Sequence, residues 1–209
     1  MLITINEVFG IAAVTLVVGF IISGYIQRPK NPVEMLYRKP SFIDWEDMKF
    51  AMMVSGPAII LHELGHKFVA QRYGAFAEYR AWTLGLAIAV LTAYFQFPIV
   101  FAAPGAVYIH GGHRHLTKDE NGKIALAGAG VNFILAIIFI IIGNSFGGMA
   151  EIGRLGAQVN AFLGTLNLVP FGPLDRTKVK HRSNSVWLAS FGVLLLTLMF
   201  TFRISLVAL

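Results

Sequence analysis

The residues of this chain best suited to chemistry by type and spacing are those of His62-Glu63-Leu64-Gly65-His66. On a helix, side chains at positions i and i+4 share a face about 6 Å apart, so the two imidazoles can bind one metal ion. Glu63 lies about 100° around the helix from His62, where its carboxylate can take a proton from a metal-bound water. The pattern therefore predicts a metal site that activates water, with Glu63 as general base.

The motif follows an apolar run that is typical of a membrane helix. Residues 51–61 read Ala-Met-Met-Val-Ser-Gly-Pro-Ala-Ile-Ile-Leu and carry no charge. Ionisable side chains are costly in a membrane unless they have partners, so three together indicate a functional site. A satisfied polar cluster inside a helical bundle is the structural alternative.

A catalytic zinc site needs a third protein ligand, and Asp175 is the leading candidate. Cysteine is absent, so the ligands must be His, Asp or Glu. Asp175 ends an apolar segment broken by Pro170, Gly172 and Pro173. Such breaks free backbone groups and let a segment unwind into a polar cavity. From these residues alone, an ordinary juxtamembrane acid paired with Arg176 or Lys178 is equally open.

Two motifs together resemble the site-2 protease family of intramembrane zinc metalloproteases. They are His-Glu-x-x-His and, about 100 residues later, Asn167-Leu-Val-Pro-Phe-Gly-Pro-Leu-Asp175. The resemblance implies that His62, His66 and Asp175 bind one zinc ion per chain and that Glu63 is the catalytic base. It also implies that Asn167 helps to bind substrate or to stabilise the oxyanion. Members of that family cleave transmembrane helices of substrate proteins within the bilayer.

The resemblance covers about 48–180 and includes a third, weaker motif. Gly128-Ala-Gly-Val-Asn132 is similar to the family's Gly-Pro-x-x-Asn signature, with Ala129 in place of proline. The family's metal-binding Asp is usually followed by Gly, whereas here Arg176 follows. Neither departure removes a ligand, but Arg176 places a cation beside the metal carboxylate.

Composition indicates an all-α polytopic membrane protein. Of the 209 residues, 56% are hydrophobic and 13% charged. The net charge of +6 comes from Lys and Arg in short loops beside apolar runs, which is typical of topology signals and headgroup contacts. We therefore expect an integral, multi-pass protein of the cell membrane. Its expected partners are the lipid bilayer and transmembrane substrate proteins, and not nucleic acid.

Five apolar segments are long enough to span a bilayer. They lie at about 6–26, 48–72, 122–143, 154–171 and 184–207. A sixth, 82–109, is interrupted by Gln96, Pro98 and Pro104. It predicts either a full span, giving six passes, or a re-entrant hairpin with two arms of about a dozen residues.

The metal ligands decide between these two topologies. The distribution of Lys and Arg favours six passes. However, His62 and His66 lie near the C-terminal end of their helix, and Asp175 lies at the C-terminal end of its own. Both ends must face the same side of the membrane, which requires an even number of crossings between them. We therefore predict the re-entrant hairpin, with the active site nearer the cytoplasmic face.

We expect the chain to divide into three parts. The parts are an N-terminal transmembrane helix and basic loop (1–47), a metalloprotease membrane core (48–183) and a C-terminal transmembrane helix (184–209).

Two other functions remain open. One is that of a non-proteolytic metal-binding relative, against which the intact Glu63 argues. The other is a metal transporter, which usually carries several ionisable groups along its helices. His110, His113 and His115 indicate a solvated loop rather than a second metal site.

Overall fold

The computed structural model describes residues 3–37, 44–95, 105–110, 115–169 and 175–207. Its helices are α1 (Ile5–Ser23), α2 (Pro32–Tyr37), α3 (Trp45–Arg72), α4 (Thr83–Tyr94), α5 (Lys118–Ser145), α6 (Ala150–Leu168), α7 (Arg176–Arg182) and α8 (Asn184–Val207). A short 3-10 turn, η1 (Gly147–Met149), precedes α6. The strands are β1 (Phe76–Ala81) and β2 (Gly105–His110).

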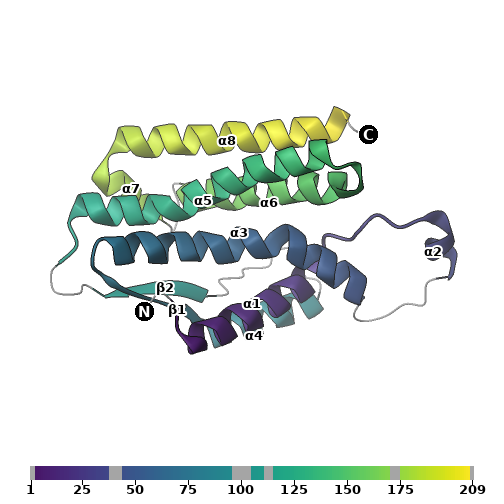
Figure 1. Cartoon of the computed structure of the whole chain (residues 1–209), viewed down its shortest axis with the longest axis horizontal. Coiled ribbons are helices and arrows are strands. Elements are labelled where there is room, and N and C mark those ends of the chain that lie inside the picture. Colours follow the sequence, from purple (N-terminus) through teal and green to yellow (C-terminus); the bar gives the residue numbers. More distant parts are fainter. Residues whose placement is uncertain (1–2, 38–43, 96–104, 111–114, 170–174, 208–209) are drawn as a thin grey trace.

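Helix α3 runs through the middle of the molecule. Figure 1 shows α5, α6 and α8 on one side of it, and α1, α4 and the two strands on the other. Its contacts reach α1, α5, α6, β1 and β2. Ala51, Val54 and Ala58 of α3 are fully buried in this packing. The polar motif near the C-terminal end of α3 can therefore meet residues from both sides of the molecule.

The expected count of five full spans plus one re-entrant hairpin is not supported. Among the described residues, three helices are long and apolar enough to cross a membrane: α1, α5 and the Asn184–Arg203 part of α8. Helices do form close to 48–72 and 154–171, as α3 and α6. Both bury polar side chains inside the bundle, such as His62 in α3 and Asn160 in α6, and these residues make the two helices less apolar.

The expectation of an all-α fold is corrected by a two-stranded sheet. β1 and β2 pair antiparallel, from Phe76 opposite His110 to Ala81 opposite Gly105. The segment expected to form two helical arms contains one helix, α4, and then the strand β2. An apolar run such as 105–109 is compatible with either structure, and a distant partner strand decides between them. Gln96, Pro98 and Pro104 lie outside the described residues.

The pairing of the strands nevertheless bears on topology. Because Gly105 lies opposite Ala81, the two ends of the segment between them are side by side. The chain therefore leaves the end of β1, forms α4 and enters β2 beside the residue that it left. A re-entrant hairpin in the membrane stays a prediction.

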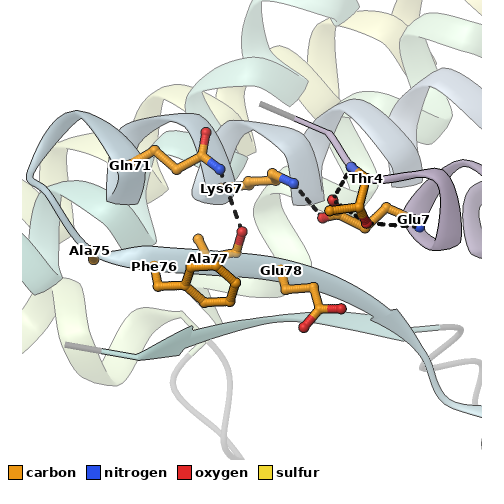
Figure 2. A pocket seen from close by; sticks show the side chains of 8 residues that line it. All are labelled: Thr4, Glu7, Lys67, Gln71, Ala75, Phe76, Ala77 and Glu78. Carbon is orange, nitrogen blue, oxygen red and sulfur yellow. Dashed lines mark hydrogen bonds and ion pairs between the residues drawn. The ribbon is translucent and has the colours of Figure 1, made fainter. Parts of the chain in front are cut away.

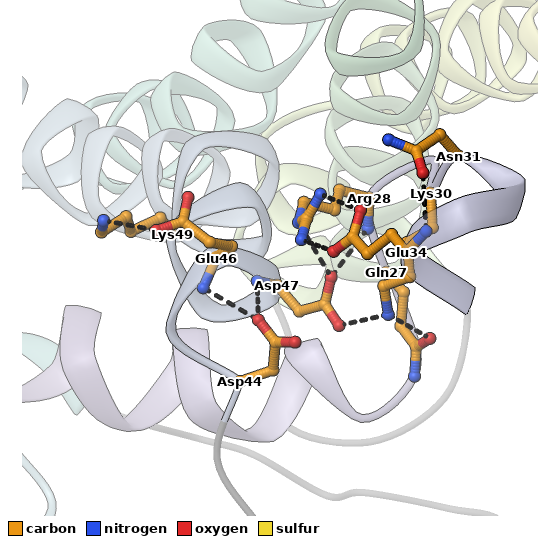
Figure 3. Close-up of polar contacts among 9 residues, drawn as sticks. All are labelled: Gln27, Arg28, Lys30, Asn31, Glu34, Asp44, Glu46, Asp47 and Lys49. Carbon is orange, nitrogen blue, oxygen red and sulfur yellow. Dashed lines mark hydrogen bonds and ion pairs between the residues drawn. The ribbon is translucent and has the colours of Figure 1, made fainter. Parts of the chain in front are cut away.

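Ion pairs tie the loop after α1 to the first turn of α3. Asp44 caps α3 by accepting from the backbone N–H groups of Glu46 and Asp47, both at 3.0 Å. The buried Asp47 carboxylate then pairs with Lys30 at 2.7 Å and with Arg28 at 3.7 Å (Figure 3). These contacts fix the start of α3 against the end of α1.

Candidate metal centre

His62, His66 and Asp175 converge on one point. The Nε2 atoms of the two histidines are 3.0 Å apart. The Asp175 Oδ2 atom lies 3.4 Å from His62 Nε2 and 3.0 Å from His66 Nε2. The histidines are 4% and 7% exposed, so both imidazoles are nearly closed to solvent, whereas Asp175 is partly exposed. The three residues together could hold a metal ion.

Helix α7 brings Asp175 to the histidines. Asp175 directly precedes α7, and Val179 of that helix is fully buried in a core cluster. The cluster also contains Ala125, Ala129, Leu168 and Leu194. At the far end of α7, Arg182 Nε donates to Asp119 Oδ1 at 2.6 Å. α7 is therefore held on α5 at both its middle and its end, and this fixes the position of Asp175.

Gly128 lets α5 approach the two imidazoles closely. A Cβ atom at this position would lie 2.5 Å from His66 Nε2 and 2.7 Å from His62 Cε1. Both distances are far shorter than a van der Waals contact. The glycine of the third sequence motif is therefore required by the packing of α5 against the histidines.

Hydrogen bonds orient both histidine rings. His66 Nδ1 lies 2.7 Å from the backbone carbonyl oxygen of Ile124. A carbonyl oxygen can only accept, so Nδ1 carries the proton and Nε2 of the neutral ring faces Asp175 with a lone pair. His62 Nδ1 lies 2.5 Å from Asn132 Oδ1.

The three residues fit a zinc ion. Two ligand atoms about 2.1 Å from a tetrahedral zinc lie about 3.4 Å apart. The three separations observed here are 3.0, 3.0 and 3.4 Å. Two imidazoles and one carboxylate also form a donor set that zinc enzymes use, with the fourth position left for water.

The electrostatics of Asp175 favour metal binding. Burial alone would raise the pKa of this carboxyl. In the metal-free site a histidine that is also protonated at Nε2 is a cation that donates to Asp175, and this interaction lowers the pKa below its ordinary value. Asp175 is therefore a carboxylate at neutral pH. A carboxyl group must be deprotonated to bind a metal.

Glu63, the expected base, lies between α3 and the strand β2. Its Oε2 atom accepts a hydrogen bond from the backbone N–H of Val107 at 3.2 Å. The side chain is half-buried. It follows His62 on the same helix, as the motif requires. The donor from Val107 was not foreseen from the sequence.

Asn167 is not part of the converging group. Its amide donates to the carbonyl oxygen of Leu163 at 3.1 Å, within α6. Its expected role toward substrate stays a prediction. Four residues singled out in the sequence lie outside the part that the structure describes. They are the helix-breaking Pro170, Gly172 and Pro173 and the loop histidine His113.

A separate pocket lies beside the metal group, on another face of α3. It has a volume of about 280 Å³ and is drawn in Figure 2. Within it the buried Lys67 ammonium pairs with the Glu7 carboxylate, which also accepts from the Tyr79 backbone N–H at 2.7 Å. His62, His66 and Asp175 are not among its lining residues. The ion pair joins α1, α3 and β1.

Comparisons with known proteins find relatives in the archaeon Methanocaldococcus jannaschii. The chain is 41% identical over 140 residues to a protein named, provisionally, as a zinc metalloprotease, covering 66% of this chain and 72% of that relative. It is 28% identical over 141 residues to a second zinc metalloprotease, covering 66% of this chain and 34% of the relative. The chain thus spans about a third of that second protein. No protein-family model and no solved structure matches the chain.

Proposed function

Because the chain belongs to the zinc metalloprotease family of these relatives, we propose that it is an intramembrane protease of the site-2 type. One zinc ion is held by His62, His66 and Asp175. The strongest support is the convergence of these three side chains at 3.0 to 3.4 Å, from elements far apart in the sequence. Their spacing and donor chemistry suit a catalytic zinc with one open position.

The proposed site of action is the membrane. Three described helices are long and apolar enough to span a bilayer, and one of them, α5, packs against both α3 and α7, where the metal group lies. The substrates are then transmembrane segments of other proteins. A helical substrate must unwind locally before attack, because the carbonyl groups of a helix are hydrogen-bonded along its axis.

The chemistry divides between the metal and Glu63. When bound, zinc polarises the scissile carbonyl and lowers the pKa of its water to about 7. Glu63 takes the proton from the attacking water and later delivers it to the leaving amine nitrogen. The Val107 N–H holds the Glu63 carboxylate toward the sheet, on the flank of the metal group.

The cytoplasmic face is the proposed side of the active site. α7, which carries Asp175 at its start, has exposed Lys178 and Lys180 and leads directly into the candidate span of α8. Basic residues next to the end of a transmembrane helix are enriched on the cytoplasmic side.

Cleavage by the purified protein tests this function. The protein is reconstituted in liposomes with zinc and a set of single-span test substrates whose helices contain helix-breaking residues. We expect cleavage by the wild type and no cleavage by Glu63→Gln, with the zinc content of the two unchanged. Glu46→Gln, an exposed carboxylate of the same helix, is the matched control and should cleave normally.

Two outcomes would overturn the proposal. Zinc-loaded wild type that cleaves none of the substrates but carries zinc across the liposome membrane would indicate a transporter. Equal cleavage by wild type and Glu63→Gln would remove Glu63 as the base.

A further inference from the structure

Two asparagines inside the helical bundle have no exposed surface. They are Asn132 of α5 and Asn160 of α6, both 0% exposed. Burying an amide is costly unless its polar atoms are hydrogen-bonded. Both side chains are in fact bonded, and their bonds lead to a metal-binding histidine.

The bonds form a chain from α6 through α5 to α3. Asn160 Nδ2 donates to the Gly156 carbonyl oxygen at 2.8 Å. Asn132 Nδ2 donates to Asn160 Oδ1 at 3.1 Å and to the Ala58 carbonyl oxygen at 2.9 Å. Asn132 Oδ1 lies 2.5 Å from His62 Nδ1. Every member of the chain is thus joined to the next.

The two backbone carbonyls determine the orientation of both amides. Gly156 O can only accept, so it takes the nitrogen of Asn160 and leaves Oδ1 facing Asn132. Ala58 O and Asn160 Oδ1 are both acceptors, so they take the nitrogen of Asn132. The oxygen of Asn132 then faces His62, whose Nδ1 must carry the proton.

We propose that Asn132 and Asn160 are positioning residues that fix the tautomer and the ring orientation of His62. With its proton on Nδ1, the neutral ring directs the Nε2 lone pair toward His66 Nε2 and Asp175 Oδ2, where the metal would bind. The inference rests on the proposed zinc site and adds the residues that prepare one of its ligands. A histidine ligand whose second nitrogen donates to a fixed acceptor is held in place and made more basic.

The two histidines differ in how they are held. His66 donates to Ile124 O, which belongs to the backbone and does not depend on any side chain. His62 depends on Asn132 directly and on Asn160 through Asn132. Substitutions of the asparagines should therefore affect the His62 ring and leave the His66 ring in place.

The test measures the zinc dissociation constant by chelator competition for Asn132→Leu, Asn160→Leu and the double variant. Loss of such outer partners typically weakens metal binding about 10- to 100-fold. We expect Asn132→Leu within that range and Asn160→Leu near its lower end. Because Asn160 acts through Asn132, the double variant should bind zinc no more weakly than Asn132→Leu alone. Thr165→Val, another buried polar residue of α6 that donates only within its own helix, is the matched control and should bind zinc like the wild type.

A second readout reports the tautomer directly. Histidine-selective ¹⁵N spectra of the wild type should show His62 protonated at Nδ1, and Asn160→Leu should show a mixture of forms for His62 only. A wild type that binds no zinc would defeat the proposed function, and the ¹⁵N spectra of that protein would still test whether the two asparagines fix the tautomer of His62. Zinc binding with unchanged affinity in both leucine variants, or a bare His62 Nδ1 in the wild type, would overturn the inference.

Discussion

The backbone N–H of Val107 donates to the Glu63 carboxylate at 3.2 Å, which joins the proposed base to the β-hairpin. Val107 lies opposite Tyr79, whose own N–H donates to Glu7 at 2.7 Å. The N–H groups of this pair therefore point away from the sheet on both edges, as in a pair without mutual hydrogen bonds. Each edge is bonded to a carboxylate, one from α1 and one from α3.

Replacing Val107 by proline should slow cleavage and leave zinc binding intact. The substitution removes the N–H that holds Glu63, and a misplaced catalytic group costs about tenfold or more in rate. Proline is tolerated where the N–H points away from the partner strand. The rate and the zinc content are measured on the same preparation.

Ile109→Pro is the control for that substitution. Ile109 lies two residues further along β2, opposite Ala77, so its N–H also points away from β1. It should keep the cleavage rate close to that of the wild type. A Val107→Pro protein as fast as this control would show that Glu63 needs no support from β2.

Alanine at Gly128 should weaken zinc binding by at least about tenfold, a loss typical of disturbed ligand support. The new methyl group would overlap the rings of both His62 and His66. Gly130→Ala is a matched control, because nothing in the described part of the chain lies within 4 Å of a Cβ there. Zinc titration of the two variants gives the comparison. Equal affinities would contradict the close packing of α5 on the histidines.

Breaking the buried pair of Glu7 and Lys67 should destabilise the fold. Both side chains are 1% exposed, and removing one partner of a buried ion pair costs about 3–5 kcal/mol. Lys67→Met should therefore unfold at much lower denaturant concentration than the wild type. The double variant with Glu7→Gln should recover part of the loss, because no charge is left alone. A single variant as stable as the wild type would mean that the pair does not join α1 to α3.

The contact of Asp119 with α7 predicts a pH dependence of stability. Hydrogen bonds from Arg182 and Lys123 lower the pKa of Asp119 below 3.8. A lowered carboxyl pKa adds stability above its unfolded value, and that stability is lost as pH falls through the folded value. Metal-free Asp119→Asn should thus melt below the wild type at pH 7 and at pH 5, and the gap should close in stronger acid. A gap that persists undiminished at pH 2 would contradict this assignment.

The two histidines of the candidate metal group could be predicted from the sequence because their spacing is a local pattern. Residues spaced like His62 and His66 lie on the same face of any helix, whatever the rest of the fold. The structure contains this helix as α3. Asp175 was predicted from a broken apolar segment and from the resemblance to a family motif, and the structure places it beside the histidines. The even number of membrane crossings inferred from these ligands stays a prediction, and five full spans are not supported.

The pairing of β1 with β2 and the hydrogen bonds from Asn160 through Asn132 to His62 could not be predicted from the sequence, for a physical reason. β2 is an apolar run whose strand conformation depends on β1, more than twenty residues earlier. Asn160 resembles any buried asparagine that bonds its own helix, and its link to His62 exists only after α3, α5 and α6 pack. Contacts between common residue types that are far apart in the sequence produce no recognisable local sequence pattern.

The zinc content per chain of the purified protein, measured for the wild type beside Asp175→Ala, tests the central claim most directly. We expect about one tightly held zinc in the wild type and weak or no retention in the variant, because a catalytic site needs three protein ligands. Asn144→Leu, an exposed substitution on α5, should retain zinc like the wild type. Zinc held equally well by Asp175→Ala, or a folded wild type without zinc, would contradict the three-ligand site.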